Sequence, residues 1–149
     1  MVDRVVLLDA GPIGLATNPK LSPQSLECAE WLHQLMIGGV QVMIPEIADY
    51  EVRRELLRAK KNRGLRKLDD LCGLADYLPI NTAGIRCATQ FWTDLRQQGR
   101  PTADDFSLDA DMILAGQALT LGIDVVVATT NLAHLSRVVP AKHWHDIVL

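Results

Sequence analysis

Short, unbroken runs of apolar residues constrain the fold of this chain most, because such runs are typical of strands buried on both faces of a sheet. They are Arg4-Val5-Val6-Leu7-Leu8, Val40 to Ile44, and Val125 to Ala128. Apolar residues at helical spacing fill the sequence between these runs, and parallel strands need such helical crossovers. We therefore expect a single α/β domain with a mainly parallel central sheet.

The other expected elements follow from local start and stop signals. Asp9 to Pro12 predicts a turn after the first strand. We expect a helix from Ile47 to Ala59, and Pro45 before it suits the first turn at the start of that helix. Ser22-Pro23 predicts a helix start, and Gly38-Gly39 its end. We also expect helices over Leu65–Ala75, from Asn81-Thr82 to Gln98 and from Ser107 to Gly122, and strands over Tyr77–Ile80 and Ile147–Leu149.

Length and composition favour an ordinary globular protein. The 149 residues predict one domain, 1–149, and 48% apolar with 22% charged residues excludes general disorder. No apolar run approaches the roughly 20 residues that span a bilayer, and the N-terminus lacks the pattern of a signal peptide. We expect a cytoplasmic protein without a membrane partner. Three widely spaced cysteines support neither a disulfide framework nor a zinc site.

Acidic and amide side chains gather where the predicted strands end. Asp9 follows the first strand, Asn131 follows the strand at Val125, and Glu51 lies one turn into the helix after the second strand. Asp109 and Asp111 stand in the first turn of the helix that leads to the strand at Val125. Because ligands bind beyond the carboxyl ends of parallel strands, these oxygen donors are expected at one edge of the sheet.

Clustered carboxylates repel one another and are costly to keep ionised unless a cation compensates. Oxygen donors select hard cations, so Mg²⁺ or Mn²⁺ fits the set and zinc does not. Such ions activate water and neutralise charge on a phosphodiester, and the set therefore predicts phosphodiester hydrolysis. Each acid alone also has a plainer interpretation: Asp109 and Asp111 as helix caps, Asp9 as a turn residue, Glu51 as an ion-paired surface residue, and Asn131 as the cap of a short helix.

Four segments resemble the successive motifs of PIN domains, the VapC-type ribonucleases. They are Val-Leu-Leu-Asp9-Ala, Ile47 to Val52, Leu108 to Ala118, and Val126 to Asn131, and their order and spacing match over nearly the whole chain. The resemblance implies a PIN-like three-layer fold and a magnesium- or manganese-dependent endoribonuclease, commonly the toxin of a toxin–antitoxin pair. It implies RNA as substrate and a small antitoxin protein as partner.

Carried over by position, the resemblance assigns catalysis to Asp9, Glu51, Asp111 and Asn131. The expected metal ligands are Asp9, Asp111 and Glu51, with Asp109 as a neighbour or second ligand and Glu46 as a weaker rival to Glu51. Two positions depart from the family pattern: Gly11 stands where a small hydroxyl residue or Asn is usual, and Asn131 stands where many members have Asp. These departures keep open a non-catalytic PIN-like module that binds RNA or protein.

The helix that carries Glu51 runs into a strongly basic stretch. Net charge is −3 for the whole chain, yet eight cationic residues lie between positions 53 and 67. Lys and Arg contacts to phosphates supply affinity for nucleic acid regardless of sequence. The same cations could dock an acidic segment of an antitoxin. The predicted RNA-binding residues are Arg53, Arg54, Arg58, Lys60, Lys61 and Arg63.

Other patterns are weaker. His143-Trp144-His145 alternates like a strand and could place both imidazoles on one face, but a lone His-x-His is more often a surface or packing feature. The aromatic residues, 5% of the chain, are too dispersed for base stacking. A phospho-acceptor signalling domain is disfavoured because only one acid, Asp9, follows the first strand. We expect a homodimer.

Overall fold

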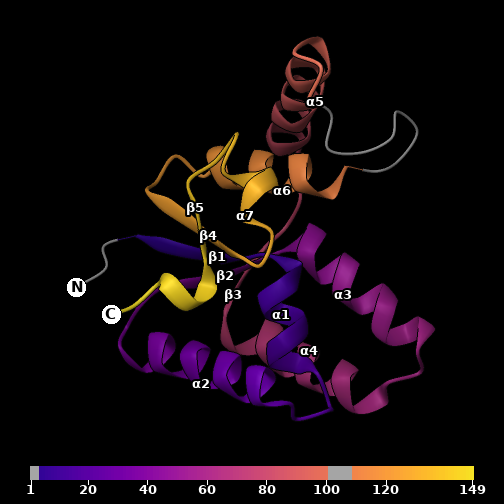
Figure 1. Cartoon of the computed structure of the whole chain (residues 1–149), viewed down its shortest axis with the longest axis vertical. Helices are drawn as coiled ribbons and strands as arrows, with labels where there is room; N and C mark the ends of the chain where they lie inside the picture. The colour runs from indigo at the N-terminus through magenta and orange to yellow at the C-terminus, as the bar shows by residue number, and fades with distance from the viewer. Residues whose placement is uncertain (1–3, 101–108) are drawn as a thin grey trace.

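The computed structural model describes residues 4–100 and 109–149 (Figure 1). Its five strands form one sheet in the order β3-β2-β1-β4-β5, and every neighbouring pair is parallel. The expected α/β fold with a parallel sheet is thus confirmed, and within the described residues the sheet is entirely parallel. The strands are β1 (Val5–Leu8), β2 (Val42–Pro45), β3 (Asp76–Leu78), β4 (Val125–Thr129) and β5 (Ala141–His143).

Helices cover both faces of this sheet, as Figure 1 shows. Helices α1 to α4 pack on one face, and α5 and α6 pack on the other. The helices are α1 (Ala10–Thr17), α2 (Pro23–Ile37), α3 (Glu46–Arg58), α4 (Asn62–Leu74), α5 (Thr82–Gln97), α6 (Ala110–Leu119), α7 (Leu132–Leu135) and a 3-10 turn, η1 (Trp144–Asp146).

Alternation along β1 divides the core into two halves. Val6 and Leu8 pack with α1 to α4, whereas Val5 and Leu7 pack with α5 and α6. All four side chains are buried, which explains why the strand sequence shows no polar alternation. The sheet therefore lies between two apolar layers of side chains, and this packing holds the strand ends in position.

The predicted turn at Asp9 to Pro12 is wrong, because α1 begins directly after Asp9. Pro12 stands in the first turn of α1, where its missing N–H costs no hydrogen bond. Two glycines and a proline hid this helix from sequence patterns. Pro45, expected inside the next helix, is instead the last residue of β2 and the N-cap of α3.

The end of the chain also differs from expectation. Ile147–Leu149 is not a strand; β5 is formed earlier, by Ala141–His143, and Trp144 begins the 3-10 turn. The indole of Trp31 donates a 2.7 Å hydrogen bond to the carbonyl of Ile147, which ties this segment to α2. His143 and His145 therefore do not share a strand.

Two further boundaries shift. Helix α4 begins at Asn62, three residues before the expected start at Leu65. Helix α6 is described from Ala110, and the expected start at Ser107, with Asp104 and Asp105, lies outside the described residues. Among the helices that the structure describes, none is long and apolar enough to cross a lipid bilayer.

Candidate active site

The two central strands deliver the first part of the site. β1 pairs with β2 on one side and with β4 on the other. The strands that follow β1 are therefore added first on one side of it and later on the other. The carboxyl ends of strands at such a switch point form the crevice in which ligands bind in open α/β sheets. Asp9 follows β1 there, and Thr129 ends β4.

Asp9 is fixed on both carboxylate oxygens. It caps α1, with Oδ1 accepting from the backbone N–H of Ala10 at 2.8 Å, and Oδ2 accepts from the hydroxyl of Thr129 at 2.7 Å. Only 7% of Asp9 and none of Thr129 is exposed to solvent. Burial raises the pKa of Asp9, and the two hydrogen bonds oppose that rise. Asp9 is therefore a buried carboxylate in a defined orientation.

Glu51 lies on α3 and is only partly exposed. Burial, the negative charge of Asp9 and that of Asp111 raise its pKa to about 7, and Arg54 opposes the shift. Asp9, Glu51 and Asp111 thus act on one another although they come from three separate elements. The effect of both charges on Glu51 indicates that these three predicted site residues lie near one another.

Asp111 stands in the first turn of α6, and its pKa is raised chiefly by burial and by the charge of Asp9. Its Oδ2 lies 3.3 Å from Nδ1 of His134, and the same ring nitrogen lies 3.1 Å from Nδ2 of Asn131. His134 therefore links two of the predicted site residues. Sequence reasoning missed it; its only signal was a position three residues after Asn131, one turn along a short helix.

Asn131 and Asp109 occupy different surroundings. The backbone N–H of Asn131 donates to Thr129 Oγ1 at 2.8 Å, and its side chain makes no capping bond to α7. Asp109 is the N-cap of α6, accepts from the N–H of Met112 at 3.3 Å, and lines a cavity beside α5. Glu46, the rival to Glu51, accepts from the N–H of Ile80 at 2.9 Å. Asp111 and Glu51 are thus the acids that interact electrostatically with Asp9.

Gly11 has a structural explanation. A Cβ added there would lie 2.2 Å from Oγ1 and 3.0 Å from Cβ of Thr130, so α1 can approach the loop after β4 only because this residue is glycine. Glycine at this position, in place of the expected small hydroxyl residue or Asn, therefore lies in close contact with the Thr130 side chain.

The donor set fits a divalent cation in chemistry, since Asp9, Glu51 and Asp111 supply hard oxygen ligands and their mutual repulsion would be relieved by positive charge. Within residues 4–100 and 109–149, no three His, Cys, Asp or Glu side chains lie close enough to hold a metal ion as they stand. Mg²⁺ is usually held by one or two carboxylates together with several waters, so the carboxylates of Asp9, Glu51 and Asp111 need not all ligate it at once.

A cleft of about 480 Å³ lies between α1 and α3 and reaches Glu51. Small residues of α1 line one side and charged residues of α3 line the other. Glu51 is the only member of the predicted catalytic set among the residues that line it. The lining residues are Ala10, Gly11, Gly14, Thr17, Asn18, Glu51, Val52, Arg54, Glu55, Leu56, Arg58, Ala59 and Lys61.

The predicted RNA-binding cations differ in their partners. Arg53 bridges Asp49, at 3.0 Å, and Asp69, at 2.8 Å, and so ties α3 to α4. Arg58 pairs with Glu55 at 2.6 Å. Arg54 lies over the ring of Tyr50, with its guanidinium carbon 5.1 Å from the ring centre. Lys60, Lys61 and Arg63 are exposed.

Comparison with known proteins identifies relatives by structure alone. No family model matches the sequence, and no curated protein is detectably similar to it. A chain of VapBC2 from Rickettsia felis, solved with a DNA fragment from its promoter, matches with a TM-score of 0.74 and 17% identity, over 94% of this chain and 98% of that chain.

Two further solved structures match over similar lengths. A chain of DNA-bound VapBC from Salmonella typhimurium has 20% identity and a TM-score of 0.71, and covers 95% of this chain and 98% of that chain. A chain of FitAcB from Neisseria gonorrhoeae has 18% identity and a TM-score of 0.69, with 95% and 99% covered. The chain therefore has, across nearly its full length, the PIN-like fold of these toxin–antitoxin proteins.

Proposed function

We propose that this protein is a Mg²⁺- or Mn²⁺-dependent endoribonuclease that hydrolyses RNA phosphodiester bonds as the toxin of a toxin–antitoxin pair. One observation carries the proposal: burial and the charges of Asp9 and Asp111 raise the pKa of Glu51, so three carboxylates from separate elements act on one another, and Glu51 lines a cleft. Groups with shifted pKa values cluster at functional sites, and a carboxylate cluster at strand ends is suited to a divalent cation.

Each residue of the candidate site has its own role in the proposed reaction. Asp9 and Asp111 hold the cation, Glu51 ligates it or orients the attacking water, and Asp109 is a neighbouring acid at the start of α6. Asn131 orients the site through His134. When bound, the cation would supply positive charge against the phosphate and acidify water. Thr129 keeps Asp9 in its orientation, so that this ligand need not be ordered when the cation binds.

We infer the partners of this protein from its charge distribution and from its likeness to solved complexes. The exposed cations Arg54, Lys60, Lys61 and Arg63 bind RNA phosphates, and Arg58 joins them when released from Glu55. VapBC and FitAB structures are complexes, which supports an antitoxin partner for this chain. The single domain, 1–149, acts in the cytoplasm as a homodimer.

Cleavage of a mixed pool of structured and unstructured RNA tests the proposal. Purified protein is incubated with Mg²⁺, Mn²⁺ or chelator, next to Asp9→Asn, Asp111→Asn and, as a matched control, Glu55→Gln. Glu55 lies one turn from Glu51 on α3, is exposed and pairs with Arg58. We expect metal-dependent cutting by the wild type and by Glu55→Gln, and none by the two Asp variants. Cutting that persists in Asp9→Asn contradicts the assignment.

A second candidate is a non-catalytic module that binds RNA. It is favoured by Asn131, which lowers the negative charge of the site, and whose side chain lies beside His134. This module retains RNA but does not cut it, with or without metal, and loses no affinity in Asp9→Asn. The cleavage assay therefore separates the two functions when RNA retention is measured on the same samples.

A further inference from the structure

Gln117 is a buried amide in an otherwise apolar part of the core. It lies on α6, and 3% of it is exposed to solvent. The same half of the core contains the apolar side chains of Ile47, Met112 and Ile113. Burying an amide costs free energy unless the amide is hydrogen-bonded. The partners of this side chain therefore indicate what it contributes.

The amide of Gln117 joins three elements of the fold. Its Oε1 accepts from the backbone N–H of Ile47 at 3.4 Å, and its Nε2 donates to the carbonyl of Leu78 at 2.9 Å. Ile47 stands in the first turn of α3, and Leu78 is the last residue of β3. One side chain of α6 thus bonds to the start of a helix and to the end of a strand.

The bond to Ile47 supplies a partner that α3 does not provide for itself. The first N–H groups of a helix have no partner within the helix, and a side chain at the N-cap usually supplies one. The N-cap of α3 is Pro45, which makes no such hydrogen bond. Ile47 is 3% exposed, so bulk water has little access to its N–H. Gln117 therefore acts as a distant cap of α3.

A second side chain holds the same junction. Oε1 of Glu46, the first residue of α3, accepts from the backbone N–H of Ile80 at 2.9 Å. The segment at the end of β3 is thus bonded to α6 through Leu78 and to α3 through Ile80. Because hydrogen bonds weaken steeply with distance and angle, these bonds resist a shift of α3 against α6.

Helix α6 is itself held closely by α5. A Cβ added to Gly116 would collide with the carbonyl oxygen of Gly84, so the backbones of the two helices are in contact at this point. Gly116 directly precedes Gln117. The amide therefore reaches α3 from a part of α6 that has little room to move.

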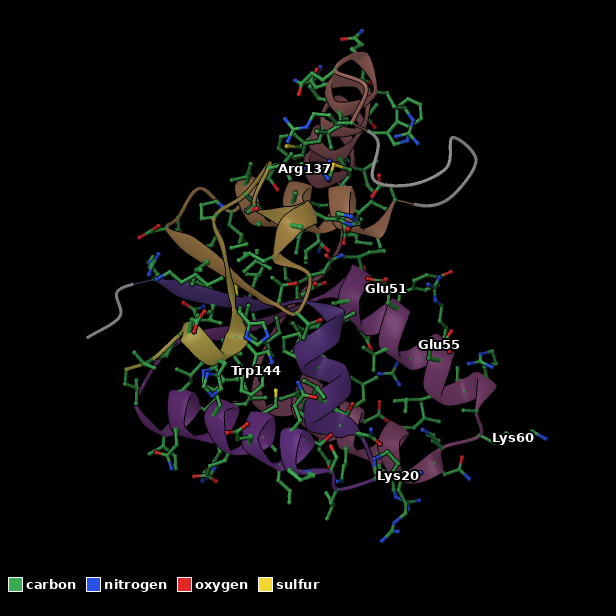
Figure 2. All side chains as sticks on the ribbon, viewed as in Figure 1. Lys20, Glu51, Glu55, Lys60, Arg137 and Trp144 are labelled. Carbon is green, nitrogen blue, oxygen red and sulfur yellow. The ribbon has the colours of Figure 1, made fainter. Side chains whose placement is uncertain are left out.

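The two helices at this junction carry two of the predicted metal ligands. Asp111 lies six residues before Gln117 on α6, and Glu51 lies four residues, about one turn, after Ile47 on α3. Helices α3 and α6 are in contact (Figure 1), and Figure 2 shows Glu51 on the part of α3 nearest the sheet. A helix that shifts at its first turn carries the residue one turn later with it. The bond to Ile47 therefore bears on the separation of Glu51 from Asp111.

We propose that Gln117 is a positioning residue of the candidate site: its amide holds the start of α3 against α6 and so sets the position of Glu51 relative to Asp111. This inference rests on the proposed function and adds to it a residue that binds neither the cation nor RNA. Ligands from separate helices bind a cation best when the residues behind them keep those helices in place. Removing the amide relaxes the junction and weakens binding of the cation.

Calorimetric titration with Mn²⁺ tests the inference on the wild type, Gln117→Met, Glu51→Gln and the double variant. Methionine gives a flexible, unbranched side chain that fills the site but makes neither hydrogen bond. We expect Gln117→Met to weaken Mn²⁺ binding about tenfold or more in the wild-type background. In the Glu51→Gln background it should change affinity less than about twofold, because a residue that acts through Glu51 has no carboxylate left to position.

Val40→Ala is the control for a general loss of stability. Val40 is buried and precedes β2, at the opposite end of that strand from α3. It should lower the melting temperature but change Mn²⁺ affinity less than about twofold. RNA cleavage by Gln117→Met should slow at limiting Mn²⁺ and recover when Mn²⁺ is raised, with KM for RNA unchanged. If Gln117→Met does not fold, Gln117→Asn replaces it, because its shorter side chain cannot reach both partners, and the same comparison decides.

Equal Mn²⁺ affinity of the wild type and Gln117→Met overturns the inference, and so does an equal loss of affinity in both backgrounds. The second result would mean that the amide supports the fold without acting through Glu51. Either result, together with metal-dependent cleavage of RNA by the wild type, refutes the inference alone. Mn²⁺ binding that depends on Gln117 in a protein that cuts no RNA refutes the proposed hydrolysis alone.

Discussion

The hydroxyl of Thr129 donates a 2.7 Å hydrogen bond to the carboxylate of Asp9, so that the last residue of β4 orients the first residue after β1. Thr129 Oγ1 also accepts from the backbone N–H of Asn131 at 2.8 Å. One fully buried hydroxyl thus connects two residues of the candidate site.

Replacing Thr129 by Val should therefore damage both stability and activity. The substitution keeps the shape of the side chain but leaves a buried carboxylate oxygen and an N–H without this partner, which costs about 1–3 kcal/mol each when unsatisfied. We expect a lower denaturation midpoint and at least tenfold slower RNA cleavage, whereas Thr129→Ser keeps both near wild type. Equal activity of Val and Ser variants would show that the hydrogen bond to Asp9 is not needed.

The two glycines of α1 should respond to alanine in opposite directions. Gly14→Ala should raise the free energy of unfolding by about 0.5–1 kcal/mol, because alanine is the better helix former and its Cβ meets open space. Gly11→Ala should lower it by about 1–3 kcal/mol, because its Cβ would collide with Thr130. Chemical denaturation measures both, and adding Thr130→Ala should restore most of the loss at Gly11.

Stability should fall as pH rises toward neutrality when no divalent metal is present. The pKa of Glu51 is raised from 4.5 to about 7, so between these values the folded protein keeps a proton that the unfolded chain releases. The folded state then binds more protons, and the free energy of unfolding decreases with rising pH across this window. The raised pKa values of Asp9 and Asp111 act in the same direction.

Denaturant midpoints at pH 5 and pH 8 measure this effect in the wild type and in Glu51→Gln. The decrease should be smaller in the variant, and Mn²⁺ should offset it in the wild type by binding the ionised carboxylates. A wild type that is equally stable at both pH values, or more stable at pH 8 without metal, contradicts the raised pKa of Glu51.

His134 should affect metal affinity although it is not among the predicted ligands. It lies 3.3 Å from Asp111, and partners that orient a metal ligand commonly change affinity about 10- to 100-fold when removed. We expect this loss in a Mn²⁺ titration of His134→Ala. His33→Ala, a change of an exposed residue on α2, is the control and should bind Mn²⁺ like the wild type.

Patterns in the sequence predicted the framework well because they reflect burial. Strands buried on both faces read as unbroken apolar runs, and the acids at their ends were placed together by the topology of a parallel sheet. The resemblance of four segments to PIN-domain motifs led to the same fold as the solved structures. The choice of Asp111 over Asp109 stays a prediction, although Asp109 caps α6 while the charge of Asp9 acts on Asp111.

The parts that sequence could not predict depend on contacts between distant segments. Helix α1 was not predicted because Gly11, Pro12 and Gly14 are typical of a turn. The helix is stabilised instead by the cap at Asp9 and by the packing of Ile13 in the core. His134 has no motif, and its contact with Asp111 spans 23 residues. Strand β5 was missed because its three residues are not strongly apolar and are held by pairing with β4.

The bond between Asp9 and Thr129 also has a consequence for the order in which the protein matures. The chain is synthesised from its N-terminus and a domain folds as a unit, so a nascent chain that ends before β4 already contains Asp9 and Glu51 but cannot complete the fold. It lacks the strand that pairs with β1, the hydroxyl that orients Asp9 and the turn that carries Asn131. The candidate centre is therefore assembled only when about seven eighths of the chain has been made, and truncated products of translation would carry its acids without its geometry.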